Sequence, residues 1–217
     1  MGSLHLTLGI SALAACAAAG AGAVREPAPV AANRPVAADT LKDQLLRGRQ
    51  LVIEHACGDC HGGGSNPGSP TWLAGVTDSL QIFQIGPFKT RPRNITPDNT
   101  TGIGRFTTRQ LFNALRYGLR PGETPDVEIT STTPGQGNFP DNPKYLAIPM
   151  PWPAFRHMSD DDLRAIAVYL KQGVKPVSNR VGDSDGPPDF WASEYTLEKI
   201  GPYPASPFPT SREQAVQ

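Results

Sequence analysis

An all-α fold of three to five helices joined by long loops is what the sequence predicts, on three observations. Apolar residues recur at helical spacing after Thr40, over 108–117 and over 159–172. The 217 residues include 22 Gly and 23 Pro, which leaves much of the chain in irregular loops without reaching a composition typical of disorder. The residue types AVILMFWYC make up 38%, enough for a buried core. A long sheet and a coiled coil are both disfavoured by this pattern.

The first helix begins after Thr40, a good N-cap residue. Its apolar face consists of Leu41, Leu45, Leu46, Val52 and Ile53. Gly48 lies inside this helix, where Gly costs about 1 kcal/mol relative to Ala. A glycine in that place usually marks the close approach of another helix, and the segment 159–172 is the candidate partner.

Two further helices carry start signals. The segment 159–172 opens with Ser159 and has Asp162 three residues later, which is the pattern of a capping box. The acidic residues of its first turn suit the positive end of the helix dipole. The segment 108–117 is expected to be capped by Thr107 or Thr108 and to end at Gly118.

The N-terminal residues have the pattern of a targeting segment rather than of a folded element. Residues 4–23 are apolar but rich in Ala and Gly, which makes a weak transmembrane helix and a plausible export signal. Within them, Leu13-Ala14-Ala15-Cys16 resembles the lipobox of bacterial lipoproteins, which implies that Cys16 becomes the lipidated first residue of the mature protein. Plain secretion with cleavage after Ala23 and an uncleaved anchor are the alternatives. Residues 24–39, rich in Pro and Ala, predict a tether.

The strongest signal is Cys57-Gly58-Asp59-Cys60-His61, the C-x-x-C-H motif for attachment of a c-type haem. At this spacing two thiols reach the vinyl groups on one edge of the porphyrin, and His61 supplies the proximal imidazole. Zinc needs four ligands, and no further Cys follows Cys60. A thioredoxin-like dithiol needs a preceding strand, and a structural disulfide leaves His61 unexplained. The single motif therefore predicts one covalently bound haem c.

The iron of such a haem needs a sixth ligand, and Met150 is the first candidate. Prolines on both sides of it force an extended, stiff loop that can hold a thioether over the metal. Met158 fits better as a core residue beside the start of the last helix. His157 is a third candidate ligand, although it is more simply interpreted as an exposed histidine in a loop. The fourth possibility is that the sixth position is vacant.

Further motifs carry a family resemblance. Asn94-Ile95-Thr96-Pro97-Asp98 and Thr101-Gly102-Ile103-Gly104, with Met150-Pro151-Trp152 and Met158-Ser159-Asp160, resemble the cytochrome c domains in subunits of membrane-bound alcohol and gluconate dehydrogenases. The resemblance covers about residues 41–173 and implies a class I cytochrome c fold around one haem. It implies that Asn94 and Trp152 pack near the haem and that Met150 is axial. Those subunits commonly carry three such domains, whereas this chain has one C-x-x-C-H motif.

These features predict a periplasmic, membrane-tethered cytochrome c that carries single electrons between redox protein partners and has no catalytic residues. We expect a dehydrogenase or quinol-oxidising protein as donor, an oxidase or another cytochrome as acceptor, and a lipid on Cys16 as the membrane anchor. Lys+Arg and Asp+Glu number 20 each, which argues against nucleic acid as a partner. The alternatives are a haem subunit of a periplasmic dehydrogenase complex, and a gas- or peroxide-reactive haem protein with a weakly held sixth site.

The predicted organisation is a signal or lipoprotein segment (1–23), a tether (24–39), a cytochrome c domain (40–173) and a Pro- and aromatic-rich C-terminal extension (174–217). Basic residues are concentrated over 86–120. The three interpretations are neutralisation of haem propionates, docking of an acidic partner and an ordinary solvent-exposed face. Residues 122–147 form a polar insertion with no assigned function. The aromatic residues of the extension indicate that it packs on the domain or on a partner, and 193–200 has the pattern of a short helix.

Overall fold

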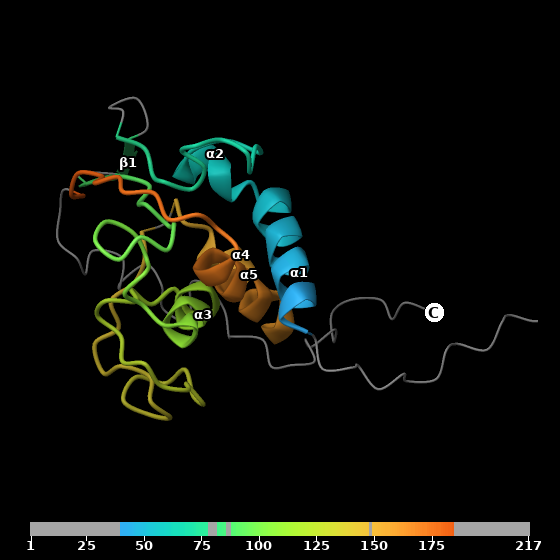
Figure 1. Cartoon of the computed structure of the whole chain (residues 1–217). Coiled ribbons are helices and arrows are strands. Elements are labelled where there is room, and N and C mark those ends of the chain that lie inside the picture. The colour runs from blue at the N-terminus through green and yellow to red at the C-terminus, as the bar shows by residue number, and fades with distance from the viewer. Residues whose placement is uncertain (1–39, 78–81, 86–87, 148, 185–217) are drawn as a thin grey trace, which may run out of the picture. The chain divides into compact units, whose positions relative to one another are not determined.

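The computed structural model describes residues 40–77, 82–85, 88–147 and 149–184 (Figure 1). The segment that contains Cys16, the tether and the helix expected over 193–200 lie outside these residues. The described elements are α1 (Leu41–Glu54), α2 (Cys57–His61), β1 (Phe83–Ile85), β2 (Phe88–Thr90), α3 (Thr108–Tyr117), α4 (Trp152–Phe155) and α5 (Asp160–Gln172). The regular structure in the described part of the chain is therefore mainly helical, and long loops join the helices, as the sequence predicts.

Helices α1 and α5 pack directly against each other, which confirms the interpretation of Gly48 (Figure 1). A Cβ added at Gly48 would clash with the carbonyl oxygen of Ala165 and would lie 2.6 Å from the Cβ of Tyr169. An ion pair closes the same interface, with Nε of Arg47 2.7 Å from a carboxylate oxygen of Asp162. The hydrogen bond from Arg47 lowers the pKa of Asp162.

Side chains cap the helices where the sequence indicates. Thr40 and Asp43 form a capping box on α1, and Thr107, rather than Thr108, forms one with Gln110 on α3. The hydroxyl of Ser159 accepts the N–H of Asp162 at the start of α5. Helix α3 ends at Gly118, whose φ of 69° is left-handed, so a residue with a Cβ would be strained there.

Strands β1 and β2 form a small antiparallel hairpin that the sequence analysis does not predict. Phe83 pairs with Thr90, and Gln84 pairs with Lys89. Each strand has only three residues, too few for an alternating pattern to be recognised. The hairpin leads into the loop that begins at Arg91.

The main hydrophobic core lies between α1, α3 and α5. Its buried members include Leu51 and Val52 from α1, Leu111, Phe112 and Leu115 from α3, and Leu163, Ile166 and Leu170 from α5. Trp72 and Leu73 reach it from the glycine-rich loop after α2, and Phe155 reaches it from α4. Cys57, Met150 and Met158 are partly buried against this same core.

A second, smaller core explains the insertion over 122–147. Its buried residues are Leu119, Ile129, Phe139, Tyr145 and Trp152. The rings of Tyr145 and Trp152 stack with their centroids 5.5 Å apart and their planes 4° from parallel. The insertion is thus a structural unit that surrounds Trp152, although its sequence is largely polar.

The chain beyond α5 returns to the domain. Residues 177–183, which we call the C-terminal strap, run beside the loop of residues 91–96 (Figure 1). The backbone N–H of Val177 donates to Thr96 Oγ1 at 3.1 Å. The backbone N–H of Asn179 donates to Thr101 Oγ1 at 2.9 Å. The first residues of the predicted C-terminal extension therefore pack on the domain.

Candidate haem-binding site

The C-x-x-C-H residues form a single helical turn, α2, that directly follows α1. Ala56 separates the two helices in a left-handed conformation, with φ 51°. For a residue with a Cβ this conformation costs roughly 1–2 kcal/mol, and it turns the chain sharply between the helices. The sharp turn lets α2 start immediately, so that Cys57, Cys60 and His61 lie within one short element.

Both cysteines of this turn are half-buried free thiols. Burial raises the pKa of Cys57 to about 11, so this thiol is protonated at neutral pH. Reactive dithiol motifs have a lowered thiol pKa instead, and here a helix rather than a strand precedes the motif. The geometry therefore disagrees with a thioredoxin-like dithiol.

The imidazole of His61 is held in one tautomer. Its Nδ1 lies 2.7 Å from the backbone carbonyl oxygen of Arg93. A carbonyl oxygen only accepts hydrogen bonds, so we assign the proton to Nδ1, which leaves the lone pair on Nε2. Burial lowers the pKa of His61, and the bond to Arg93 raises it in part, so the ring is neutral at neutral pH. A neutral imidazole with Nε2 available is the form that ligates a metal.

This donor set fits a covalently held haem better than a protein-bound ion. Two thiols and an imidazole lie on one turn, and the second nitrogen of the imidazole is fixed by a carbonyl, as in many metal-ligating histidines. Within the described ranges, no group of three or more His, Cys, Asp or Glu side chains is arranged to hold a metal ion. The zinc interpretation gains no support from the described residues.

Met150 lies on a tight turn just before α4. Its N–H donates to the carbonyl of Ala147 at 2.9 Å, and its own carbonyl accepts the N–H of Trp152 at 2.8 Å. Its side chain is half-buried against the main core, on which Cys57 also packs. Met158 is half-buried against the same core, so burial alone does not separate the two methionines. The choice of Met150 as sixth ligand stays a prediction.

His157, the third donor, is exposed and already engaged. Its Nε2 accepts a hydrogen bond from Nε of Arg156 at 3.2 Å. Partial burial and the positive charges of Arg156 and Arg116 lower the pKa of His157. These contacts favour the simpler interpretation, a loop histidine.

Asn94 and Trp152, the two predicted haem-packing residues, are both buried but in different surroundings. Asn94 is 2% exposed, and its Nδ2 donates to Thr101 Oγ1 at 3.0 Å and to the carbonyl of Val177 at 2.7 Å. Its Oδ1 accepts the N–H of Thr96 at 2.9 Å. Trp152 is fully buried in the second core. Both side chains fasten loops, and haem packing stays a prediction for each.

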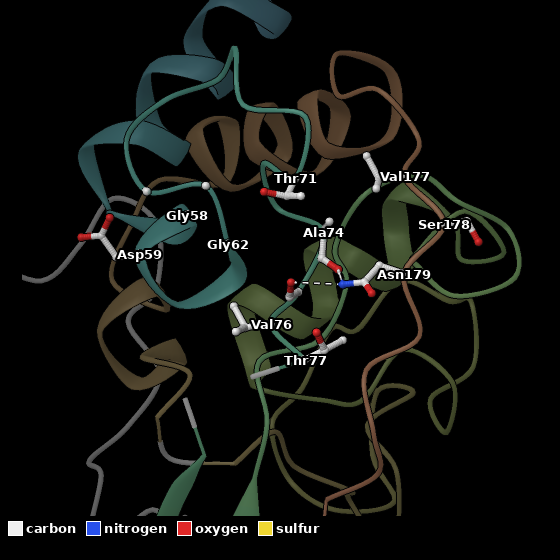
Figure 2. Close-up of a pocket in the computed structure, with 13 residues that line it drawn as sticks. Gly58, Asp59, Gly62, Thr71, Ala74, Val76, Thr77, Val177, Ser178 and Asn179 are labelled. Carbon is white, nitrogen blue, oxygen red and sulfur yellow. Dashed lines mark hydrogen bonds between the residues drawn. The ribbon is translucent and has the colours of Figure 1, made fainter. Parts of the chain in front are cut away.

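A cavity of about 700 Å³ lies behind the α2 turn (Figure 2). Gly58 and Asp59 of the turn, the glycine-rich loop that follows it, and Val177 to Asn179 of the C-terminal strap line this space. Cys57, Cys60, His61 and Met150 are not among the lining residues described. The cavity is thus next to the proposed attachment turn but is not bounded by its thiols or its imidazole.

Several of the basic residues over 86–120 bond to other parts of the domain. Arg93 reaches the carbonyls of the C-terminal strap, and Arg120 pairs with Glu123. Arg116 is buried, with its guanidinium on the carboxylate of Asp160 and on the carbonyl of Arg156. These three side chains are therefore engaged within the domain.

The sequence analysis did not predict which loop the C-terminal strap contacts, and it did not predict the second core. Asn94 and Val177 are 83 positions apart in sequence, so no local pattern could reveal their contact. The glycines after α2 were the one local sequence signal that the loop beside the motif has an unusual conformation. Gly62, Gly63, Gly64 and Gly75 all have positive φ, which marks a loop of unusual backbone conformation beside the motif.

Comparison with known proteins gives relatives that are cytochrome c subunits. The chain is 31% identical over 153 residues to the fructose dehydrogenase cytochrome subunit of Gluconobacter japonicus, across 70% of this chain and 24% of that protein. It is 31% identical over 154 residues to the gluconate 2-dehydrogenase cytochrome c subunit of Pantoea cypripedii, across 70% of this chain and 28% of that protein. The cytochrome c subunit of the alcohol dehydrogenase (quinone) of Gluconobacter oxydans is 35% identical over 96 residues, across 43% of this chain and 16% of that protein.

These relatives confirm the resemblance that the motifs indicate. The described fold agrees with a cytochrome c fold, and the sequence is related to the cytochrome c subunits of fructose, gluconate and alcohol dehydrogenases. The chain spans about a quarter of the length of the first two of these relatives. No family model matches the chain. None of the described helices is both long and apolar enough to cross a membrane.

Proposed function

We propose that this chain is a monohaem cytochrome c that transfers single electrons between protein partners. The observation that carries the proposal is the α2 turn, in which Cys57 and Cys60 are followed by an imidazole whose Nδ1 is bonded to the carbonyl of Arg93. That bond leaves Nε2 as the donor atom toward an iron. Relatives named as cytochrome or cytochrome c subunits of fructose, gluconate and alcohol dehydrogenases support the same function.

Each residue of the site has a distinct part in this proposal. Cys57 and Cys60 would hold the ring through thioether bonds to its vinyl groups, and His61 and Met150 would supply the two protein ligands of the iron. When bound, the haem would supply a one-electron couple between a reduced donor protein and an oxidised acceptor protein. The turn from Ala147 to Trp152 restrains Met150 through its backbone hydrogen bonds.

The proposed setting is the periplasmic face of a membrane. We propose that a lipid on Cys16 anchors the chain and that residues 24–39 tether the domain. The names of the relatives favour a dehydrogenase as the electron donor and a second form of the proposal, in which this chain is a subunit of such a complex. The two forms differ in whether the partner stays bound, so co-purification of a dehydrogenase distinguishes them.

Haem staining of denaturing gels tests covalent attachment. Wild-type protein made with the bacterial haem-attachment machinery should stain for haem peroxidase activity, and the C57A/C60A variant should not. The single variants C57A and C60A should stain more weakly, because one thioether still holds the ring. A double variant that stains as strongly as wild type after denaturation would refute attachment through these thiols.

A further inference from the structure

The C-terminal strap contacts the segment whose carbonyl holds His61. We propose that the strap positions the imidazole of His61, with Asn179 and Arg93 as the positioning residues. This inference rests on the proposed haem function, because it concerns the ligand that His61 would supply. It extends that function to residues beyond α5, which none of the sequence motifs includes.

The first step of the argument is the connection between His61 and the Arg93 loop. Nδ1 of His61 bonds to the carbonyl oxygen of Arg93, and the N–H of Gly75 donates to the carbonyl of His61 at 2.7 Å. A Cβ at Gly75 would lie 2.9 Å from the carbonyl carbon of Arg93 and 2.7 Å from the backbone nitrogen of Asn94. Gly75 therefore lies tightly between the backbone of His61 and the loop that supplies the acceptor.

The second step is the way the strap fastens Gly75. Nδ2 of Asn179 donates to the carbonyl of Ala74 at 2.8 Å and to the carbonyl of Gly75 at 3.2 Å. Figure 2 shows the Asn179 side chain reaching toward Ala74. Cγ2 of Val181 would lie 2.5 Å from a Cβ at Gly75, so the strap also packs on this glycine. The strap thus fixes one side of the contact by both hydrogen bonds and packing.

The third step is the way the strap fastens the acceptor loop itself. The guanidinium of Arg93 donates to the carbonyl of Gly182 at 2.9 Å and to that of Val181 at 3.2 Å. Asn94, the next residue, donates to the carbonyl of Val177 at 2.7 Å. The residue whose backbone carbonyl holds His61 is therefore bonded to the strap through its own side chain and through its neighbour.

The physical consequence is a fixed hydrogen bond behind the imidazole. A carbonyl that accepts the Nδ1 proton makes Nε2 a more basic ligand and sets the orientation of the ring. A more basic ligand stabilises the oxidised iron relative to the reduced iron, which lowers the reduction potential. Loosening the strap should weaken the bond from His61 to Arg93 and raise the potential.

Two charge-conserving variants test the inference. N179A removes both bonds to Ala74 and Gly75. R93K keeps the positive charge but replaces the guanidinium, whose Nη1 reaches the carbonyls of Val181 and Gly182, with an ammonium on a shorter side chain. S178A is the matched control, because Ser178 lies in the same segment and is exposed. The measurements are the reduction potential and, in the reduced protein, the exchange rate of the His61 Nδ1 proton by NMR.

We expect N179A to raise the potential, so that the ratio of ferrous to ferric protein at a fixed applied potential is higher than in wild type, because the hydrogen bond behind the metal ligand is weakened. The Nδ1 proton should exchange faster than in wild type. R93K should change both quantities in the same direction but less, and S178A should leave both at wild-type values. A loss of packing alone would lower stability without a directed change in the potential.

The outcomes separate this inference from the proposed function. If wild-type protein carries haem but N179A and R93K keep its potential and its proton exchange, the strap does not position His61, and electron transfer still stands. If wild-type protein binds no haem, both proposals are wrong. If N179A does not accumulate as folded protein, R93K decides alone, because its side chain is half-exposed and its charge is kept.

Discussion

The hydrogen bond from His61 to Arg93 determines which nitrogen of the ring is available. With the proton on Nδ1, the lone pair lies on Nε2, and burial keeps the ring neutral. Protonation of this partly buried imidazole would place a charge where it is poorly solvated and would remove the lone pair of Nε2. At the scale of single residues, the geometry therefore describes the proposed ligand His61 well, whereas Met150 as the sixth ligand stays a prediction beside Met158, His157 and a vacant position.

Substitution of Met150 should change the haem spectrum. A thioether favours the reduced iron, so M150H should keep the haem low-spin and lower the potential substantially, within the range of roughly 0.8 V that axial ligands span. M150A should open the iron to water, carbon monoxide or peroxide. Visible spectroscopy of the oxidised protein measures this, because Met–iron ligation gives a weak band near the red end of the spectrum.

M158L is the matched control for that experiment. Leu and Met have similar volumes, so the change should cost less than about 1.5 kcal/mol and leave the spectrum unchanged. Loss of the Met–iron band in M158L, with retention in M150A, would show that Met158 is the ligand instead. Wild-type protein that lacks the band and readily binds carbon monoxide would favour the gas- or peroxide-reactive alternative.

At the scale of elements, the contact between α1 and α5 supports the α2 turn. Gly48 allows the two helix backbones to approach closely, and Arg47 pairs with Asp162 across the same contact. The main core lies along this pair, and Cys57 packs against it immediately after α1. The position of the attachment turn therefore depends on how closely these helices pack.

G48A should destabilise the protein although alanine is the better helix former. In an isolated helix the change would gain about 1 kcal/mol. Here the new methyl group would overlap the Ala165 carbonyl and crowd Tyr169, and overpacking of this kind costs about 1–3 kcal/mol. A lower midpoint of urea unfolding is the expected result, with R49A at an exposed position of α1 as the control. An equal or higher midpoint for G48A would contradict the described packing.

The parts of the fold that the sequence predicts are those with local signals. The close approach at Gly48, the caps of α1, α3 and α5, and the end of α3 at Gly118 all follow from residues near the element concerned. The C-x-x-C-H spacing is likewise local. These features could be predicted because capping and helical periodicity act within a few residues.

The rest depends on contacts between distant residues. Leu119, Ile129, Phe139 and Tyr145 are spaced without a helical or strand period, and their burial becomes evident only when Trp152 lies among them. The bond from Asn179 to Ala74 joins residues 105 positions apart. The sequence could indicate that the C-terminal extension packs on the domain or on a partner, but not that it fastens the loop behind His61.

At the scale of the whole molecule, the chain covers about a quarter of the length of two relatives, which are named as dehydrogenase subunits. It carries one C-x-x-C-H motif, preceded by a Pro- and Ala-rich stretch and an apolar N-terminal stretch. A single haem on a tether can exchange electrons with partners at the same membrane surface. The proposed anchor would keep the domain at that surface.

The C16A variant tests the proposed anchor. Dual or triple acylation holds a protein stably on a membrane, so wild-type protein should be recovered in the membrane fraction. C16A should be released into the aqueous fraction or should fail to mature. Fractionation followed by haem staining measures this, and wild-type protein found entirely in the aqueous fraction after export would show that the lipobox interpretation is wrong.

The most direct test of the central claim is the intact mass of the mature protein under denaturing conditions. Covalent attachment through Cys57 and Cys60 predicts a mass that exceeds that of the processed polypeptide by one haem, after any lipid on Cys16 is counted. Expression with the haem-attachment machinery and mass spectrometry of the purified chain give this value. A mass equal to that of the processed polypeptide with no haem would contradict the account.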